Sequence, residues 1–122
     1  MTAARQDELA AADALFRAIL AQAEASAGRP LADAGALADH LRSLARASLE
    51  TAAALAEGRV GVDTAREAFE ARRRVLVQMR AFAELAVLNG AGAAADAIFR
   101  LLARAVRERT GIDLAPGPLQ AG

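Results

Sequence analysis

The sequence predicts an all-α protein, an antiparallel helical bundle of three long or four helices joined by short loops. Alanine occupies 36 of the 122 positions, and it has the highest helix propensity because its side chain loses no rotamer entropy on folding. Apolar residues recur three and four positions apart in several long segments, as on one face of a helix. β-Branched residues are scarce and no segment alternates with a period of two, so we expect no strand.

The first helix is expected to run from about Thr2 to Ala27. Its apolar residues keep helical spacing: Leu9, Ala12, Phe16, Ile19, Leu20 and Ala23. Gly28 and Pro30 then end the helix, because glycine tolerates a left-handed conformation and proline cannot donate the next backbone hydrogen bond.

The second helix is expected from about Asp33 to Glu57, with Asp33 as its N-cap. Its apolar stripe comprises Leu37, Leu41, Leu44, Ala45, Leu49, Ala52 and Leu55. Ser48 lies on the same face and is small enough to be buried there. Gly58 is expected to end this helix.

Asp63 is expected to cap a third helix, whose core stripe comprises Phe69, Leu76, Met79, Phe82 or Ala83, and Ala86. The segment Asn89–Gly92 leaves two interpretations open. A turn there gives a fourth helix from about Ala93 to Thr110, whereas a continuous helix extends the stripe to Ala105. Asn-Gly is a turn signal, and each glycine costs about 1 kcal/mol inside a helix, so we favour the turn. Gly111 ends the last helix.

We assign residues 1–115 to a single helical-bundle domain and residues 116–122 to a flexible C-terminal tail. The chain has no cysteine, which excludes disulfide scaffolds, thiolate metal sites and cysteine nucleophiles. A spanning helix needs about 20 apolar residues, and every such window here is interrupted by charges. The charged N-terminus is unlike a signal peptide, so we expect a cytoplasmic protein. Abundant alanine and exclusively arginine as basic residue are typical of a GC-rich bacterial genome.

Fifteen arginines balance fifteen acidic residues, so no long-range field attracts the chain to nucleic acid or to an anionic membrane. The four aromatic residues lie among apolar neighbours and are expected in the core: Phe16, Phe69, Phe82 and Phe99. They offer no platform on which bases could stack. Nucleic acid is therefore not expected as a partner, whereas a net charge near zero permits self-association.

His40 is the only histidine and supports an alternative function, phosphotransfer in a phosphorelay. Histidine phosphotransfer domains are also helical bundles of similar size, and their imidazole must be exposed near a cation. Arg42 could serve as that cation. However, Leu44 stands four positions after His40, where that family has a small residue. A solvent-facing histidine without a catalytic role is the simpler interpretation.

Two basic stripes follow from the spacing of arginines and could form an anion-binding or acidic-partner face. The first repeats every seven residues: Arg66, Arg73 and Arg80. The second comprises Arg100, Arg104 and Arg107. Acidic residues interleaved with the first stripe favour an ordinary solvated face instead.

The sequence contains no recognisable catalytic or metal-binding constellation. Di-iron helical bundles use paired Glu-x-x-His motifs, but Leu37 precedes His40 by three residues and no second histidine exists. No glycine-rich loop follows a strand, so a nucleotide-binding loop is not predicted. We therefore predict no catalytic residue, no metal and no cofactor.

These observations favour a non-enzymatic structural or interaction protein that self-associates or docks on a larger bacterial or phage assembly. Alanine-rich faces allow close helix packing, and a positive mean hydropathy leaves apolar surface for a protein partner or a second copy. The predicted interface comprises Phe82, Ala86, Gly90, Ala93 and Ala97. A further alternative is a small-molecule sensor with an apolar pocket between its helices.

Overall fold

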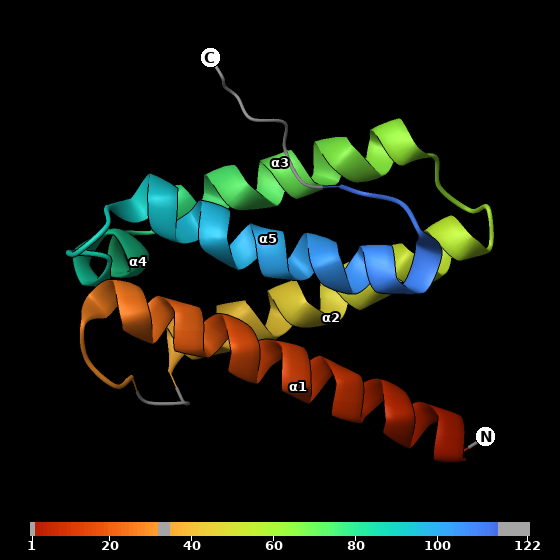
Figure 1. Ribbon diagram of the computed structural model, residues 1–122, viewed down its shortest axis with the longest axis horizontal. Coiled ribbons are helices and arrows are strands. Elements are labelled where there is room, and N and C mark those ends of the chain that lie inside the picture. Colours follow the sequence, from red (N-terminus) through yellow and green to blue (C-terminus); the bar gives the residue numbers. More distant parts are fainter. Residues whose placement is uncertain (1, 32–34, 115–122) are drawn as a thin grey trace.

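The computed structural model describes the backbone of residues 2–31 and 35–114, with side chains from Gln6 onward (Figure 1). These residues form five helices and no strand: α1 (Thr2–Ala27), α2 (Ala36–Ala56), α3 (Val62–Gln78), α4 (Arg80–Leu85) and α5 (Ala91–Thr110). The all-α helical bundle is therefore confirmed. None of these helices is both long and apolar enough to cross a membrane. The predicted tail, residues 116–122, lies outside the described residues.

The helix α5 forms the centre of the bundle, and α1, α2 and α3 all pack against it (Figure 1). Its buried face combines small and large apolar side chains: Ala94, Ala95, Ile98, Phe99, Leu102, Ala103 and Val106. The ring of Phe99 meets Phe69 of α3 edge-on, with 5.6 Å between ring centroids. This geometry is favourable for two aromatic rings, so the contact stabilises the packing of α3 against α5.

The predicted turn at Asn89 and Gly90 is confirmed. Gly90 has φ 82° and ψ 154° and precedes the first residue of α5, a conformation that essentially only glycine adopts and that costs other residues about 1–3 kcal/mol. The turn is anchored on α1, because the backbone N–H of Leu88 donates to the carbonyl oxygen of Ser26 at 3.1 Å. The side-chain amide of Asn89 also lies 3.5 Å from the Ser26 hydroxyl. The turn therefore fixes the start of α5 to the end of α1.

Two predicted helix caps are not found. The helix α3 begins at Val62 after Gly61, with no side-chain cap, so Asp63 lies inside the first turn. Its carboxylate is still favourably placed there, near the positive end of the helix dipole. Asp33 lies outside the described residues, and α2 begins at Ala36 after Gly35.

The predicted third helix is interrupted at Met79, whose extended conformation (φ −69°, ψ 123°) separates α3 from α4. A helix rotates by about 100° per residue, so in one continuous helix Leu85 would point opposite to Leu76. Both side chains are buried in the structure. The interruption therefore reorients the chain so that Phe82 and Leu85 of α4 can reach the same core as Leu76 of α3.

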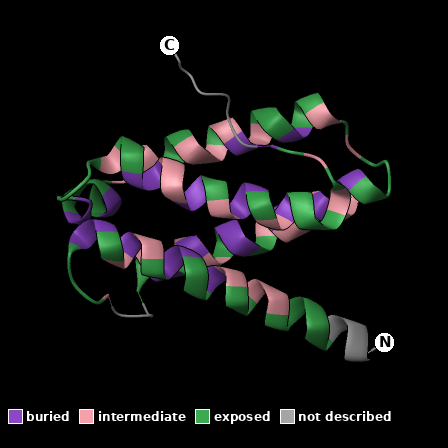
Figure 2. Ribbon diagram, in the orientation of Figure 1, coloured by how far each residue is buried: buried purple, intermediate pink, exposed green. Residues whose placement is uncertain are grey.

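The packing of α1 changes along its length (Figure 2). Every described residue from Gln6 to Ala10 is exposed, whereas the second half buries Phe16, Ile19, Leu20 and Ala23. The predicted core position of Leu9 is therefore wrong, since this side chain is 57% exposed. Figure 1 shows the reason: the first half of α1 diverges from α2 and α5. We call residues 6–15, which include no fully buried side chain, the α1 arm.

Matched truncations of two leucines test this division. We expect Leu102→Ala to lower the free energy of unfolding by about 2–5 kcal/mol, because it leaves a cavity in the core. Leu9→Ala should change it by less than about 0.5 kcal/mol, as is usual for a surface residue. Urea unfolding monitored by circular dichroism measures both values. Similar losses in the two variants would show that the arm belongs to the core.

Candidate functional site

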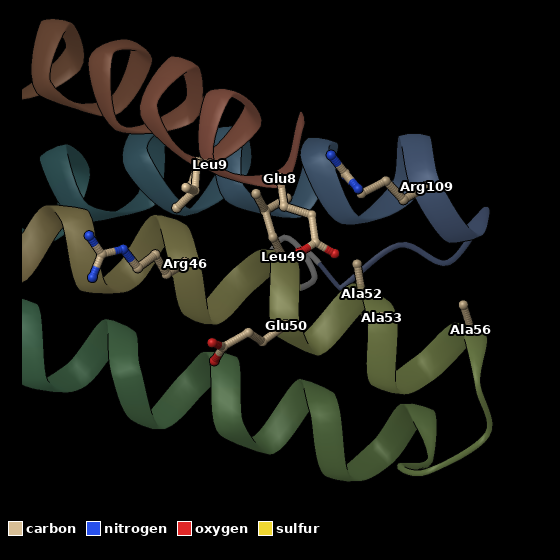
Figure 3. A pocket seen from close by; sticks show the side chains of 10 residues that line it. Glu8, Leu9, Arg46, Leu49, Glu50, Ala52, Ala53, Ala56 and Arg109 are labelled. Atoms are coloured by element: carbon tan, nitrogen blue, oxygen red, sulfur yellow. The ribbon is translucent and has the colours of Figure 1, made fainter. Parts of the chain in front are cut away.

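A groove lies between the α1 arm, the C-terminal half of α2 and the end of α5 (Figure 3). It encloses about 460 Å³. Its apolar lining consists almost entirely of small side chains and two leucines: Leu9, Ala12, Leu49, Ala52, Ala53 and Ala56. Leu9 lies above α2 on the arm, and Leu49 of α2 is only half-buried. The groove is therefore an apolar surface that the chain itself leaves uncovered.

Four exposed charged residues complete the lining: Glu8, Arg46, Glu50 and Arg109. They come from three helices, with Glu8 on α1 and Arg109 on α5 (Figure 3). Among the described residues, no ion pair involves any of the four. The groove therefore combines an apolar floor with a charged edge that makes no ion pair within the described residues.

A smaller cavity of about 180 Å³ adjoins the groove between α1 and α2. It shares Leu9, Ala12 and Arg46 with the groove. At its far end the guanidinium of Arg42 lies 4.3 Å from the centroid of the Phe16 ring. This cation–π contact covers the point where α1 enters the core. The exposed apolar surface thus ends at Phe16.

The five residues of the predicted interface do not form one surface. Phe82 and Ala86 are buried in the core, whereas Gly90 and Ala93 are exposed and Ala97 is half-buried. The turn between α4 and α5 places Phe82 and Ala86 on one segment and Ala93 and Ala97 on another. In this conformation Phe82 and Ala86 are used inside the chain.

The first basic stripe is divided among different contacts. Arg73 contacts the carboxylate of Asp96 on α5 at 3.1 Å, so it joins two helices. Arg66 donates to the carbonyl oxygen of Asp113 at 3.1 Å. Arg80 lies on α4 and pairs with Glu84 at 2.9 Å. Each of the three guanidinium groups is thus engaged by an acceptor within the chain.

The second basic stripe stays exposed on α5. Its three arginines line an open concavity of about 480 Å³ together with Ala103, Glu108 and Asp113. In the described part of the chain no ion pair involves Arg100, Arg104 or Arg107. The two acidic side chains at the same concavity reduce its positive charge.

His40 lies on α2 and is partly buried. Its Nε2 atom has no solvent contact and no hydrogen-bond partner among the described residues. Burial lowers the pKa of the imidazole below its ordinary value of 6.5. This Nε2 is out of reach of a partner that would deliver a phosphoryl group, so the geometry does not favour phosphotransfer through that atom.

No group of three or more histidine and acidic side chains within the described residues is placed to hold a metal ion. The groove lining also includes no histidine, serine or threonine among its ten residues. Sequence reasoning missed the groove because its residues lie far apart in the chain. The helical spacing of Leu9 and Ala12 predicted an apolar face on the first helix. It could not show which part of that face the neighbouring helices leave uncovered.

The partly buried imidazole of His40 predicts a pH dependence of stability. Because the folded state lowers the pKa of His40, the unfolded chain binds a proton more readily. The neutral His40 side chain makes its full contribution to the free energy of unfolding above pH 6.5. This contribution is lost as the pH falls from 6.5 through the lowered pKa of the folded state. We expect the urea midpoint of the wild type to fall more between about pH 7.5 and 5.5 than that of His40→Gln. Equal losses in both proteins would contradict this, since the acidic groups are common to both.

In comparisons with known proteins, no family model matches the chain, and no curated protein or solved structure matches it significantly. The case for function therefore comes from the groove itself.

Proposed function

We propose that this chain is a non-enzymatic helical interaction protein that self-associates or docks on a larger bacterial or phage assembly through the groove beside the α1 arm. The observation that carries the proposal is the uncovered apolar surface from Leu9 to Ala56. The rest of the apolar stripes closes into one core of buried residues. Exposed apolar surface of this kind, edged by charges, is characteristic of protein interaction sites.

The small side chains of the floor suit a helix as occupant. Helices pack with their axes 8–10 Å apart, and the distance depends on the side chains at the contact. Ala53 and Ala56 reach the surface of α2, project little from it and permit a close approach. Covering one exposed leucine contributes about 1.5–3 kcal/mol, and each additional methyl about 0.8 kcal/mol. Several such contacts are needed to offset the entropy lost on association.

The charged residues of the groove support binding better than catalysis. A guanidinium stays protonated in proteins and cannot act as a general base. Arg46 and Arg109 can instead orient an acidic partner by ion pairs, and Glu8 and Glu50 a basic one. These side chains therefore support specificity and registration of a partner.

A second candidate is the binding of an apolar small molecule. The groove volume of about 460 Å³ falls within the range of ligand sites, which is about 300–1,000 Å³. A single diverging helix forms one wall, however, so a small ligand would remain largely open to solvent. A metabolite that raises the melting temperature of the wild type, but not of Leu9→Asp, would favour this candidate.

Site-specific photo-crosslinking tests the interaction function. We expect a photoreactive residue at Leu9 to form covalent adducts with a second copy or with another protein in bacterial cells. The matched control is the same residue at Ala71, which is exposed on α3 away from the groove. Denaturing gels of the purified chain reveal the adducts. If neither the residue at Leu9 nor the one at Ala71 forms an adduct, the groove is ruled out as an interaction site.

A further inference from the structure

We propose that Asn89 is a site of spontaneous covalent modification, where the side-chain amide is lost and aspartate and isoaspartate form when the turn opens. The turn of residues 86–90 joins α4 to α5 and is called the α4–α5 turn below. Its last two residues are Asn89 and Gly90. The backbone nitrogen that follows an asparagine can attack that asparagine's own side chain, so the pair has a chemical reactivity as well as a shape.

The reaction needs only these two residues and water. The backbone nitrogen of Gly90 loses its proton to solvent and attacks Cγ of Asn89. The Cγ–Nδ2 bond then breaks, and ammonia leaves with a proton taken from solvent, which closes a succinimide ring. Water opens this ring at Cγ to give aspartate, or at the main-chain carbonyl carbon to give isoaspartate, whose backbone runs through Cβ and Cγ. Each event consumes a water and releases an ammonia, so no oxidant or reductant is required.

The surroundings of Asn89 leave room for this reaction. Asn89 is the only asparagine of the chain, and it is exposed, so water and the departing ammonia have access to it. Glycine carries no Cβ that would hinder the approach of its nitrogen. A Cβ built on Gly90 would meet no atom of the described residues within 4 Å beyond its chain neighbours. Other segments therefore do not shield the reacting atoms.

The hydrogen bonds of the closed turn oppose the reaction. The N–H of Gly90 donates to the carbonyl oxygen of Ala86 at 2.9 Å, so the attacking nitrogen keeps its proton and is held by an acceptor. The Nδ2 atom of Asn89 lies 3.5 Å from the Ser26 hydroxyl, which restrains the side chain. The N–H of Leu88 donates to the carbonyl oxygen of Ser26 at 3.1 Å. The reaction therefore proceeds through the fraction of molecules in which the turn is open.

The two products affect the turn differently. Aspartate keeps the backbone spacing and places a carboxylate just before α5, near the positive end of the helix dipole. Isoaspartate adds a backbone carbon between Leu88 and Gly90, so the bonds to Ala86 and to Ser26 can no longer form together. Opening of the turn then becomes permanent, and the anchor between the end of α1 and the start of α5 is lost (Figure 1).

Mass spectrometry of an aged sample tests the proposal. Trypsin cleaves after Arg80 and Arg100 and releases residues 81–100, in which Asn89 is the only side-chain amide. We expect this segment of the folded chain to gain the mass difference between an amide and an acid during incubation at neutral pH. A synthetic peptide of residues 81–100 should convert about tenfold faster or more, because it has no closed turn. An unaged sample digested in parallel corrects for conversion during the digest.

Two buried serines provide matched variants. Ser26→Ala removes the hydroxyl beside Asn89 and should raise the rate in the folded chain about twofold, as expected for loss of a weak hydrogen bond. Ser48→Ala removes an equally buried hydroxyl from α2, outside the turn, and should leave the rate unchanged. Asn89→Gln should show no mass gain, since its longer side chain would have to close a larger ring. Circular dichroism confirms that each variant is folded.

The product is identified by a methyltransferase that acts on the free α-carboxyl of isoaspartate. The isoaspartate form, separated by chromatography, should unfold at a lower urea concentration than Asn89→Asp, which carries the same charge on a normal backbone. Equal rates in the folded chain and in the peptide would overturn the control by the turn. If the peptide converts fully while the folded wild type and Ser26→Ala both stay unmodified, Asn89 is not a modification site of the folded protein.

Discussion

The mixed small and large face of α5 is the constraint on which the rest of the bundle depends. Ala94, Ala95 and Ala103 let neighbouring helices approach closely, while Ile98, Phe99 and Leu102 fill the remaining space. Three helices share this one face. Among the described residues of α1, Phe16 is the first that is fully buried, and before it only Leu15 packs against the core, from a partly buried position. The arm and the groove both follow from this limit.

Arginines compensate for the small apolar contribution of α3. This helix buries only Ala65, Phe69 and Leu76, and polar contacts hold it elsewhere. Arg73 reaches Asp96 of α5 at 3.1 Å, and Arg72 lies 3.5 Å from the Thr51 hydroxyl of α2. Exposed ion pairs contribute about 0–1 kcal/mol each. The Arg73–Asp96 pair is less screened by salt because it is partly covered, but desolvation of the two charges offsets part of that gain. Arg46 and Arg109 make no ion pair within the described residues, so their guanidinium groups can bind a partner at the groove.

Local signals in the sequence predicted the parts of the structure that depend on local physics. Positive φ angles occur at Gly28, Gly58, Gly90 and Gly111, where helix ends were expected. The break at Met79 was missed because it carries no glycine or proline and arises from the competition of Leu76 and Leu85 for one core. Leu9 was misplaced because periodicity identifies a face of a helix but not how far the neighbouring helices extend. The groove is lined by residues of α1, α2 and α5, which lie far apart in the sequence. Residue spacing within one segment therefore could not predict that they meet.

The α1 arm can remain helical with few tertiary contacts, and this is what makes it suited to binding. An isolated helix of about ten residues is marginal because its first turn is costly to nucleate. The arm is continuous with the packed half of α1, which supplies that nucleus, and four of the five residues from Ala10 to Ala14 are alanines with the highest propensity. An arm that is already ordered loses little conformational entropy when it is covered. The alanine that weakens the core of this chain therefore also presents a preformed helix at its surface, where the apolar contacts missing from the core can be completed by a partner.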